Sequence, residues 1–213
     1  MSDNLALFES EESASMPTKS KPFYIQFARF ISTIFSPATI SLPLILLVAF
    51  YHPNPAALQY AGVTLLFLSI GPLLYILIGV STGQFTDIDV SDRSQRTGPF
   101  LFIIGSSLVG ALILSFANGP KDLITILVLT ALTSALMMII TFWWKISMHA
   151  ASIAAVSTML TMLYGVVILP AFLLVILVDW SRVVLKRHTL GQVIAGSSLG
   201  IIMTAVTLLI RGV

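Results

Sequence analysis

The sequence predicts an all-α polytopic membrane protein, a bundle of about six to seven transmembrane helices. Hydrophobic residues make up 57% of the 213-residue chain and charged residues only 9%, which is far from the composition of soluble globular domains. No acidic or basic residue lies between Arg29 and Asp87. We therefore assign the short polar islands to loops and the apolar stretches between them to membrane spans.

One folded domain is expected behind a short tail. Residues 1–25 carry acidic residues and serines without an apolar core, so we expect a disordered tail there. Residues 26–213 are expected to form one membrane-embedded helical domain. The absence of cysteine excludes a disulfide framework, a thiolate metal site and a cysteine nucleophile. A net charge of +2 gives no reason to expect a nucleic acid partner.

The apolar stretches have the length of membrane spans, about 1.5 Å per residue across roughly 30 Å of hydrocarbon. The expected spans are residues 30–51, 57–81, 99–118, 123–144 and 189–210. Residues 150–178 are too long for one upright span. Gly165 and Pro170 predict a bend between two short helices there, with a single strongly tilted helix as the alternative. In the last span, Gly196 and Gly200 have the small-xxx-small spacing that lets helices approach closely.

Seven spans, two of them within residues 150–188, place the N-terminus and three polar islands on one membrane face. These islands are residues 82–98, 145–149 and 179–188. The face that carries them has nine lysine and arginine residues, against two on the opposite face. By the positive-inside rule we expect the islands to be cytoplasmic, in a protein of the cell (plasma) membrane.

The most polar island of the C-terminal half surrounds His188. Arg182, Lys186 and Arg187 place fixed positive charge around this imidazole, which disfavours imidazolium and keeps the ring neutral and nucleophilic near neutral pH. The same cations suit a bound phosphate. Ser181-Arg182, five residues and then His188 at the start of an apolar helix resembles the third signature of the type 2 phosphatidic acid phosphatase and haloperoxidase superfamily.

This resemblance implies that His188 is the nucleophile and that Arg182 binds phosphate. Four residues after the histidine the family has an aspartate that orients the ring, where this chain has Gln192. Side chains four residues apart lie on the same face of a helix. The Gln192 carbonyl can therefore accept a hydrogen bond from the imidazole N–H and fix the tautomer.

A second histidine stands in a similar setting. Ser147 and His149 match the family's second signature, Ser-Gly-His entering a helix, with Met148 in place of the glycine. The resemblance implies that His149 protonates the leaving oxygen and that the Ser147 hydroxyl binds phosphate, with Lys145 adding positive charge. A histidine beside a lysine at the membrane interface is also common without any catalytic role, and this interpretation stays open.

The island after the second span resembles the family's first signature, Lys-x6-Arg-Pro. Arg96 matches the arginine, Asp89 stands where the lysine is expected, and the proline is displaced to Pro99. Arg93, about one helical turn before Arg96, can supply a second guanidinium on the same face. The alternative is that the acidic and basic residues of this stretch pair with one another in a solvated loop.

Together the three motifs imply an integral membrane phosphatase that hydrolyses a lipid phosphate or diphosphate through a phosphohistidine intermediate. Phosphatidate, phosphatidylglycerol phosphate and polyprenyl phosphates fit, because their tails can remain in the bilayer. The resemblance implies no metal or other cofactor, since arginines supply the charge that stabilises the transition state. The sequence predicts no oligomeric state.

Two other functions stay open. Asp89, Met148 and Gln192 depart from the family pattern, so a noncatalytic protein that binds lipid phosphate or scaffolds partners is the main alternative. The acidic cluster Asp87, Asp89 and Asp92 suggests a further one. Membrane prenyltransferases hold magnesium diphosphate with an aspartate-rich motif after their second span.

Overall fold

The structure is a computed structural model that describes residues 22–51 and 54–212. These residues form helices joined by short loops and contain no strand, so the predicted all-α fold is confirmed. The helical elements are α2 (Phe23–Ile34), α3 (Pro37–Ala49), α4 (Ala57–Leu65), η1 (Leu66–Ile70), α5 (Gly71–Ser81), η2 (Arg93–Gln95), α6 (Thr97–Phe116), α7 (Lys121–Thr141), α8 (Met148–Tyr164), η3 (Val166–Ala171), α9 (Phe172–Val184) and α10 (Leu190–Arg211). Of the tail expected over 1–25, residues 1–21 lie outside the described part, and α2 begins at Phe23.

Most of these helices are long and apolar enough to cross a membrane. Five segments meet this description alone, and α2 with α3 makes a sixth as a bent pair. The five are Ala57–Ser81, Arg93–Phe116, Lys121–Thr141, Val166–Val184 and Leu190–Arg211. Helix α8 is apolar but shorter, with 17 residues. By the length and composition of its helices, the chain is a multi-pass membrane protein.

The first expected span, residues 30–51, is broken in the structure, so the prediction of one continuous helix was wrong. Helices α2 and α3 are bent by 47° relative to each other. Ser36 begins α3, and its Oγ accepts a hydrogen bond from the Thr39 N–H at 3.3 Å. Pro37 follows at the first helical position, where no intrahelical N–H donor is needed. The Ser-Pro pair is thus a helix-start signal inside the apolar stretch.

The bend predicted within residues 150–178 is confirmed. Helix α8 ends at Tyr164, and Gly165 has a φ of 83°, a left-handed conformation that favours glycine. The chain then turns through η3 and returns as α9. Two antiparallel helices therefore occupy this stretch rather than one tilted helix.

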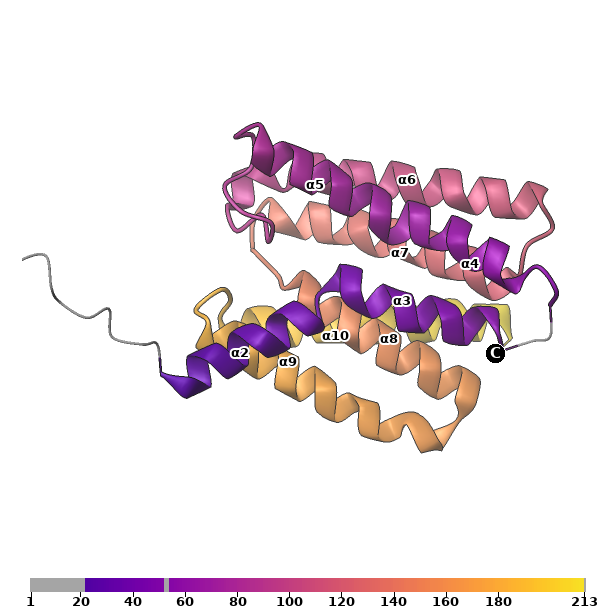
Figure 1. The fold of residues 1–213 in the computed structure, drawn as a ribbon. Coiled ribbons are helices and arrows are strands. Elements are labelled where there is room, and N and C mark those ends of the chain that lie inside the picture. The colour runs from indigo at the N-terminus through magenta and orange to yellow at the C-terminus, as the bar shows by residue number, and fades with distance from the viewer. Residues whose placement is uncertain (1–21, 52–53, 213) are drawn as a thin grey trace, which may run out of the picture.

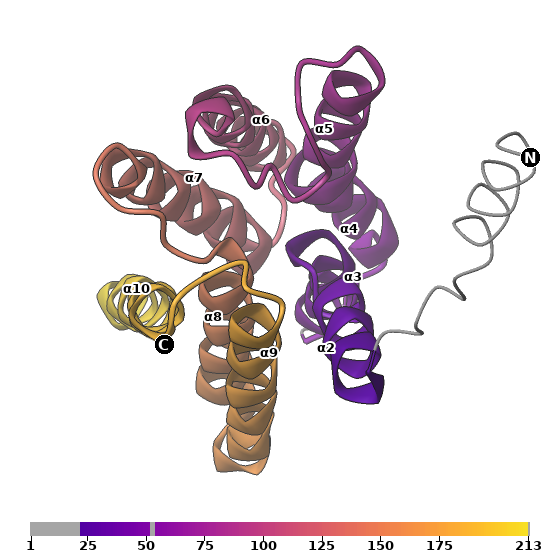
Figure 2. The same cartoon turned by 90° about the vertical axis from the view of Figure 1, so that its left-hand side faces the viewer.

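The helices form two layers, with α4 to α7 in one and α2, α3, α8, α9 and α10 in the other (Figures 1 and 2). Successive spans run antiparallel, so the start of α2 and the loops after α5, α7 and α9 lie at one end of the bundle (Figure 1). Hydrogen bonds join these loops. Arg93 Nη1 donates to the Trp143 carbonyl, and Arg187 Nη1 donates to Ser91 Oγ. The prediction that the polar islands share one face is confirmed.

Helix α8 packs closely against α10. A Cβ atom at Gly196 would lie 2.6 Å from the Ser147 carbonyl oxygen, and one at Gly200 would lie even closer to the Ala151 carbonyl oxygen. No side chain fits at either position without moving a helix. The close approach predicted from the small-xxx-small spacing is confirmed, and it holds the first turn of α8 against α10.

Gly200→Ala should destabilise the protein, because the added methyl group fits against the Ala151 carbonyl only if α8 and α10 move apart. Overpacking of this kind costs about 1–3 kcal/mol, so thermal unfolding in detergent micelles should show a lower midpoint. Gly105→Ala on α6 is the matched control, since nothing lies within 4 Å of its Cβ position and alanine favours a helix over glycine. Equal midpoints for the two variants would contradict the close contact.

Candidate functional site

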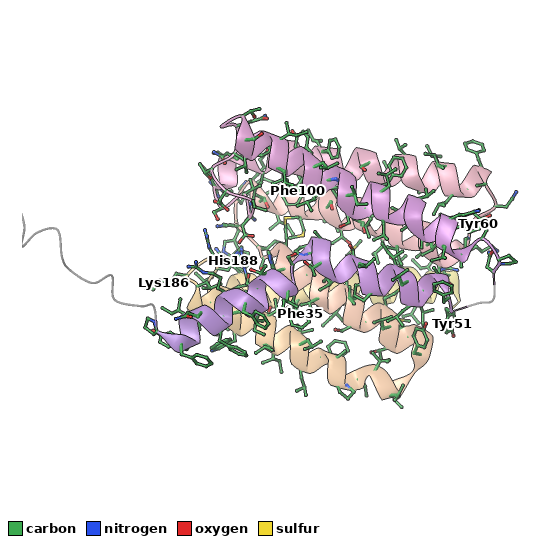
Figure 3. The ribbon with its side chains drawn as sticks, in the orientation of Figure 1. Phe35, Tyr51, Tyr60, Phe100, Lys186 and His188 are labelled. Carbon is green, nitrogen blue, oxygen red and sulfur yellow. The ribbon has the colours of Figure 1, made fainter. Side chains whose placement is uncertain are left out.

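A cavity of about 270 Å³ lies inside the bundle, between α3, α5, α6, α7 and α8. Its charged and histidine lining residues are Asp89, Arg96, His149, Arg182 and His188. The rest of the lining is largely apolar, with serine and threonine hydroxyl groups at a few positions. Figure 3 shows His188 at the end of the bundle where the polar loops gather and Tyr51 at the opposite end. The cavity therefore has one polar end and an apolar interior.

The structure brings half of the predicted site residues to this cavity. Those that line it are Arg96, His149, Arg182 and His188. Those outside its lining are Arg93, Lys145, Ser147 and Gln192. The two histidines come from different helix starts, and the two arginines come from α9 and from the residue just before α6.

Arg182 is held in one orientation by partners from two other segments. Its side chain is 3% exposed; Nη1 donates to Ser32 Oγ at 2.5 Å, and Nη2 pairs with Asp89 Oδ2 at 3.0 Å. The Arg182 carbonyl also accepts hydrogen bonds from the backbone N–H groups of Arg187 and His188. The buried Nε has no hydrogen-bond partner among the described residues. The Nε–H donor thus remains for a ligand.

Arg96 ties two loops of the polar end together. Its Nε donates to the Val90 carbonyl at 2.9 Å and its Nη1 to the Ile146 carbonyl at 3.3 Å. The side chain is buried, so these bonds also satisfy a charge that is removed from water. These two hydrogen bonds hold the Arg96 guanidinium at the wall of the cavity.

His149 enters the cavity from the first turn of α8. Ser147 precedes it as the N-cap of this helix, and its Oγ accepts the Ala150 N–H at 3.3 Å. The Ser147 hydroxyl, predicted to bind phosphate, is therefore engaged in capping. His149 is 8% exposed and interacts electrostatically with Arg182 and Asp89.

His188 lies in the turn before α10 and is 7% exposed. Burial, together with the nearby cations of Arg182, Arg96 and Lys145, lowers the pKa of His188 to about 3. The ring is therefore neutral near neutral pH. We predicted this from the surrounding positive charges, but burial is the largest cause of the lowered pKa. Its Nδ1 atom is buried and has no hydrogen-bond partner among the described residues.

Gln192 caps α10 instead of bonding to Nδ1 of His188. Its Oε1 accepts the Thr189 N–H at 3.1 Å, while Thr189 Oγ1 accepts the Gln192 N–H at 3.4 Å, a reciprocal capping box. The Gln192 side chain still lies near enough to act on the ring, because a hydrogen bond that it accepts from the imidazole raises the pKa of His188 against the larger effect of burial. Since Nδ1 stays unpaired, we take capping as the main role of this side chain.

Lys145 and Arg93 lie outside the cavity. Burial and the charges of Arg96, Arg182 and Arg187 lower the pKa of Lys145, which places its ammonium group near the polar end. The exposed side chain of Arg93 bonds to the Trp143 carbonyl. Both cations are placed to attract an anion from solvent rather than to hold it in the cavity.

Asp89 is a cavity residue that the sequence did not predict as part of the site. Asp87 Oδ1 accepts the Asp89 N–H at 2.9 Å, and Asp87 Oδ2 accepts the Ser91 N–H at 3.3 Å, which fixes the turn that carries Asp89. Burial raises the pKa of the Asp89 carboxyl, but Arg182, His149 and Arg187 outweigh burial and hold it below its ordinary value. Asp89 is therefore ionised. Its sequence signals were the density of aspartates in this island and its place at the lysine position of the first signature.

His188 should stay neutral well below the usual titration range of histidine. Because its pKa is lowered to about 3, its imidazole ¹⁵N signals should remain in the neutral form from about pH 8 down to about pH 5. The chain has three histidines, so the signal that is lost in His188→Gln identifies this ring. A midpoint near 6.5, the ordinary value, would contradict the buried placement.

Comparisons of the chain with protein-family models, with curated proteins and with solved structures found no match. Its function has to be inferred from the geometry of the cavity. Two buried guanidinium groups and two buried imidazoles meet at the polar end of an apolar space.

Proposed function

We propose that this protein is an integral membrane phosphatase that hydrolyses a lipid phosphate or diphosphate through a phosphohistidine intermediate. The observation that carries the proposal is the convergence of two histidines and two arginines, from distant parts of the chain, on one end of one cavity. The resemblance of the three sequence motifs to the type 2 phosphatidic acid phosphatase superfamily assigns these residues compatible roles.

The polar end suits an anion with several oxygen atoms. Arg182 Nε is a buried donor without a partner among the described residues, and the Arg96 guanidinium lies at the same wall. Arginine donors in a fixed fork match phosphoryl oxygens. In a site with little water these charges act on the transferring phosphoryl group more strongly than they would in solution.

The reaction proceeds in two balanced steps. In the first, a lone pair of the neutral His188 imidazole attacks phosphorus, the P–O bond to the lipid breaks, and its electron pair goes to the lipid oxygen. That oxygen takes a proton from His149, and the lipid alcohol leaves. In the second, water attacks the phosphohistidine, His149 takes the water proton back, and the electrons of the P–N bond return to His188. The products are lipid alcohol and inorganic phosphate.

The apolar interior of the cavity suits the tail of the substrate. Lining residues on α8 run from Met148 to Met159, which corresponds to about 16 Å of helix at 1.5 Å per residue. Each buried CH₂ group contributes about 0.8 kcal/mol to binding. Phosphatidate, phosphatidylglycerol phosphate and polyprenyl phosphates all present a phosphate at the end of such a tail.

We place this site at the cytoplasmic face of the cell membrane. The face that carries the polar islands has nine lysines and arginines, against two on the other face. This asymmetry supports the orientation through the positive-inside rule. The substrate tail would then enter from the bilayer and the phosphate would leave to the cytoplasm.

A noncatalytic lipid-phosphate-binding protein is the second candidate. Two observations favour it: Asp89 occupies one donor of Arg182, and Nδ1 of His188 lacks an acceptor. A nucleophilic histidine usually has its second ring nitrogen fixed by a hydrogen bond. This candidate uses the same cavity and the same arginines but performs no turnover.

The aspartates give less support to a magnesium-dependent prenyltransferase. Asp87 bonds within its own turn, Asp89 pairs with Arg182, and Asp92 Oδ1 accepts the Ser94 N–H at 2.9 Å. Among the described residues, no three histidine, aspartate or glutamate side chains are placed to hold a metal ion together. The acidic cluster is thus divided among separate partners.

Phosphate release by the purified protein from a panel of lipid phosphates, with and without chelator, tests the proposal. We expect release that persists in chelator. Release that needs magnesium and accompanies prenyl transfer would support the prenyltransferase. Binding of the lipids without any release would support the noncatalytic candidate.

The two histidines should show different defects in single-turnover kinetics. His188→Ala should abolish phosphate release from every substrate, because neither the arginines nor the serine hydroxyl groups nearby offer an activated replacement nucleophile. His149→Ala should slow a lipid phosphate by roughly 10²–10⁴-fold, since an alkoxide needs a proton as it leaves. An aryl phosphate leaves as a stable phenolate, so the His149→Ala defect should be much smaller on that substrate. Equal defects on both substrates would contradict the role of His149 as the acid.

Filling the cavity should select against long tails. Ala155 on α8 lines the cavity, so Ala155→Phe should lower kcat/KM for a long-chain lipid phosphate about 10-fold or more. Turnover of a small aryl phosphate should persist, because the polar end is unchanged. Ser198→Phe on the exposed face of α10 is the control. Equal losses on both substrates in Ala155→Phe would show that the tail lies elsewhere.

A further inference from the structure

We propose that Asp89 is a positioning residue that lets His149 take up a proton when the substrate phosphate binds. The inference rests on the proposed function, because it concerns the acid of that reaction. Asp89 stands where the resembling family has a lysine, so neither the motif nor the family's roles assign it this task. Its placement in the cavity does.

Asp89 and His149 line the same end of the cavity and interact electrostatically. The turn held by the Asp87 carboxylate fixes the backbone of Asp89, and the 3.0 Å ion pair with Arg182 fixes its carboxylate. The carboxylate is thus anchored on both sides. It cannot turn away from His149 without breaking a largely buried ion pair.

The surroundings of His149 oppose a protonated ring in the absence of substrate. Arg182 approaches from α9 and Arg96 from the start of α6, and both disfavour a further positive charge. Neutral His188 adds no charge, and the Ser32 backbone on α2 offers a hydrogen bond. Burial is the largest cost of an imidazolium at this position, ahead of the two arginines. Asp89 is the carboxylate that faces His149 within this group.

A bound phosphate dianion changes this balance. Its charges offset those of Arg182 and Arg96, so that the phosphate and the Asp89 carboxylate together favour imidazolium against the cost of burial. His149 takes one proton from bulk solvent on binding and gives it to the leaving lipid oxygen. In the second step it takes a proton from the attacking water, and it returns this proton to solvent when inorganic phosphate leaves. His149 is therefore protonated only when a phosphate is bound.

This arrangement has a consequence for the class of substrate. A protonated His149 speeds the departure of a poor leaving group such as the alkoxide of a lipid alcohol, and has little effect on the departure of a phenolate. We therefore expect the Asp89 charge to matter for alkyl phosphates in particular. Asp89→Asn is the suitable variant, because an amide oxygen can still accept the Arg182 hydrogen bond while the charge is lost.

The direct test is the ¹⁵N signal of His149 in detergent-solubilised protein with and without a non-hydrolysable long-chain alkylphosphonate, near neutral pH. The signal is identified by its loss in His149→Gln. We expect a neutral ring in the free protein and an imidazolium in the complex. In Asp89→Asn the ring should stay neutral in the complex, since loss of a nearby opposite charge lowers the protonated fraction about 10- to 1,000-fold. Asp92→Asn, an exposed carboxylate outside the cavity, should behave like wild type.

The same variants have a kinetic readout. Asp89→Asn should slow single turnover of an alkyl phosphate more than that of an aryl phosphate, and acidic pH should restore part of the loss. A ring that stays neutral in the wild-type complex, or that is protonated equally in Asp89→Asn, would overturn the inference. Faster turnover in Asp89→Asn would overturn it too, by showing that Asp89 competes with the substrate. A phosphonate that does not bind to the wild type would instead contradict the proposed function.

Discussion

The buried guanidinium of Arg182 is the interaction on which the polar end of the bundle depends. A buried cation costs several kcal/mol unless it is paired and hydrogen-bonded. Arg182 meets this requirement with Ser32 from α2 and Asp89 from the loop after α5, while its carbonyl binds the N–H of His188. Three segments that are distant in sequence are thereby drawn together. The position of His188 follows from the need to satisfy one charge.

The buried charges at the polar end destabilise the fold, and packing in the rest of the bundle offsets this cost. Arg96 and Arg182 are both buried, and two buried imidazoles line the same cavity. The two positive charges of Arg96 and Arg182 stabilise a bound anion, but they repel each other in the unliganded fold. Apolar packing offsets the cost in the opposite half, where Leu114, Leu123 and Leu127 are fully buried in one cluster. The glycine contact between α8 and α10 then fixes the helix start that carries His149.

The sequence could predict what depends on local patterns. Span lengths, the bend at Gly165 and the shared face of the polar islands follow from hydrophobicity and charge along the chain. The capping roles of Ser147 and Gln192 were also readable, because Thr189-x-x-Gln192 matches a capping box. The pairing of Asp89 with Arg182 could not be predicted in this way, since it depends on how α9 and the loop after α5 pack in space. Ser32 gave no signal at all, as a small polar residue in an apolar stretch is unremarkable.

The proposed phosphatase mechanism depends most directly on a covalent bond between His188 and phosphorus. In His149→Ala, which lacks the base for the second step, an aryl phosphate with a labelled phosphoryl group should phosphorylate the protein faster than water releases it. Rapid denaturation and mass spectrometry of the labelled peptide locate the modified residue. We predict label on His188 and none in the same variant with His188→Gln. Phosphate release from the aryl substrate without label on His188 would contradict the account.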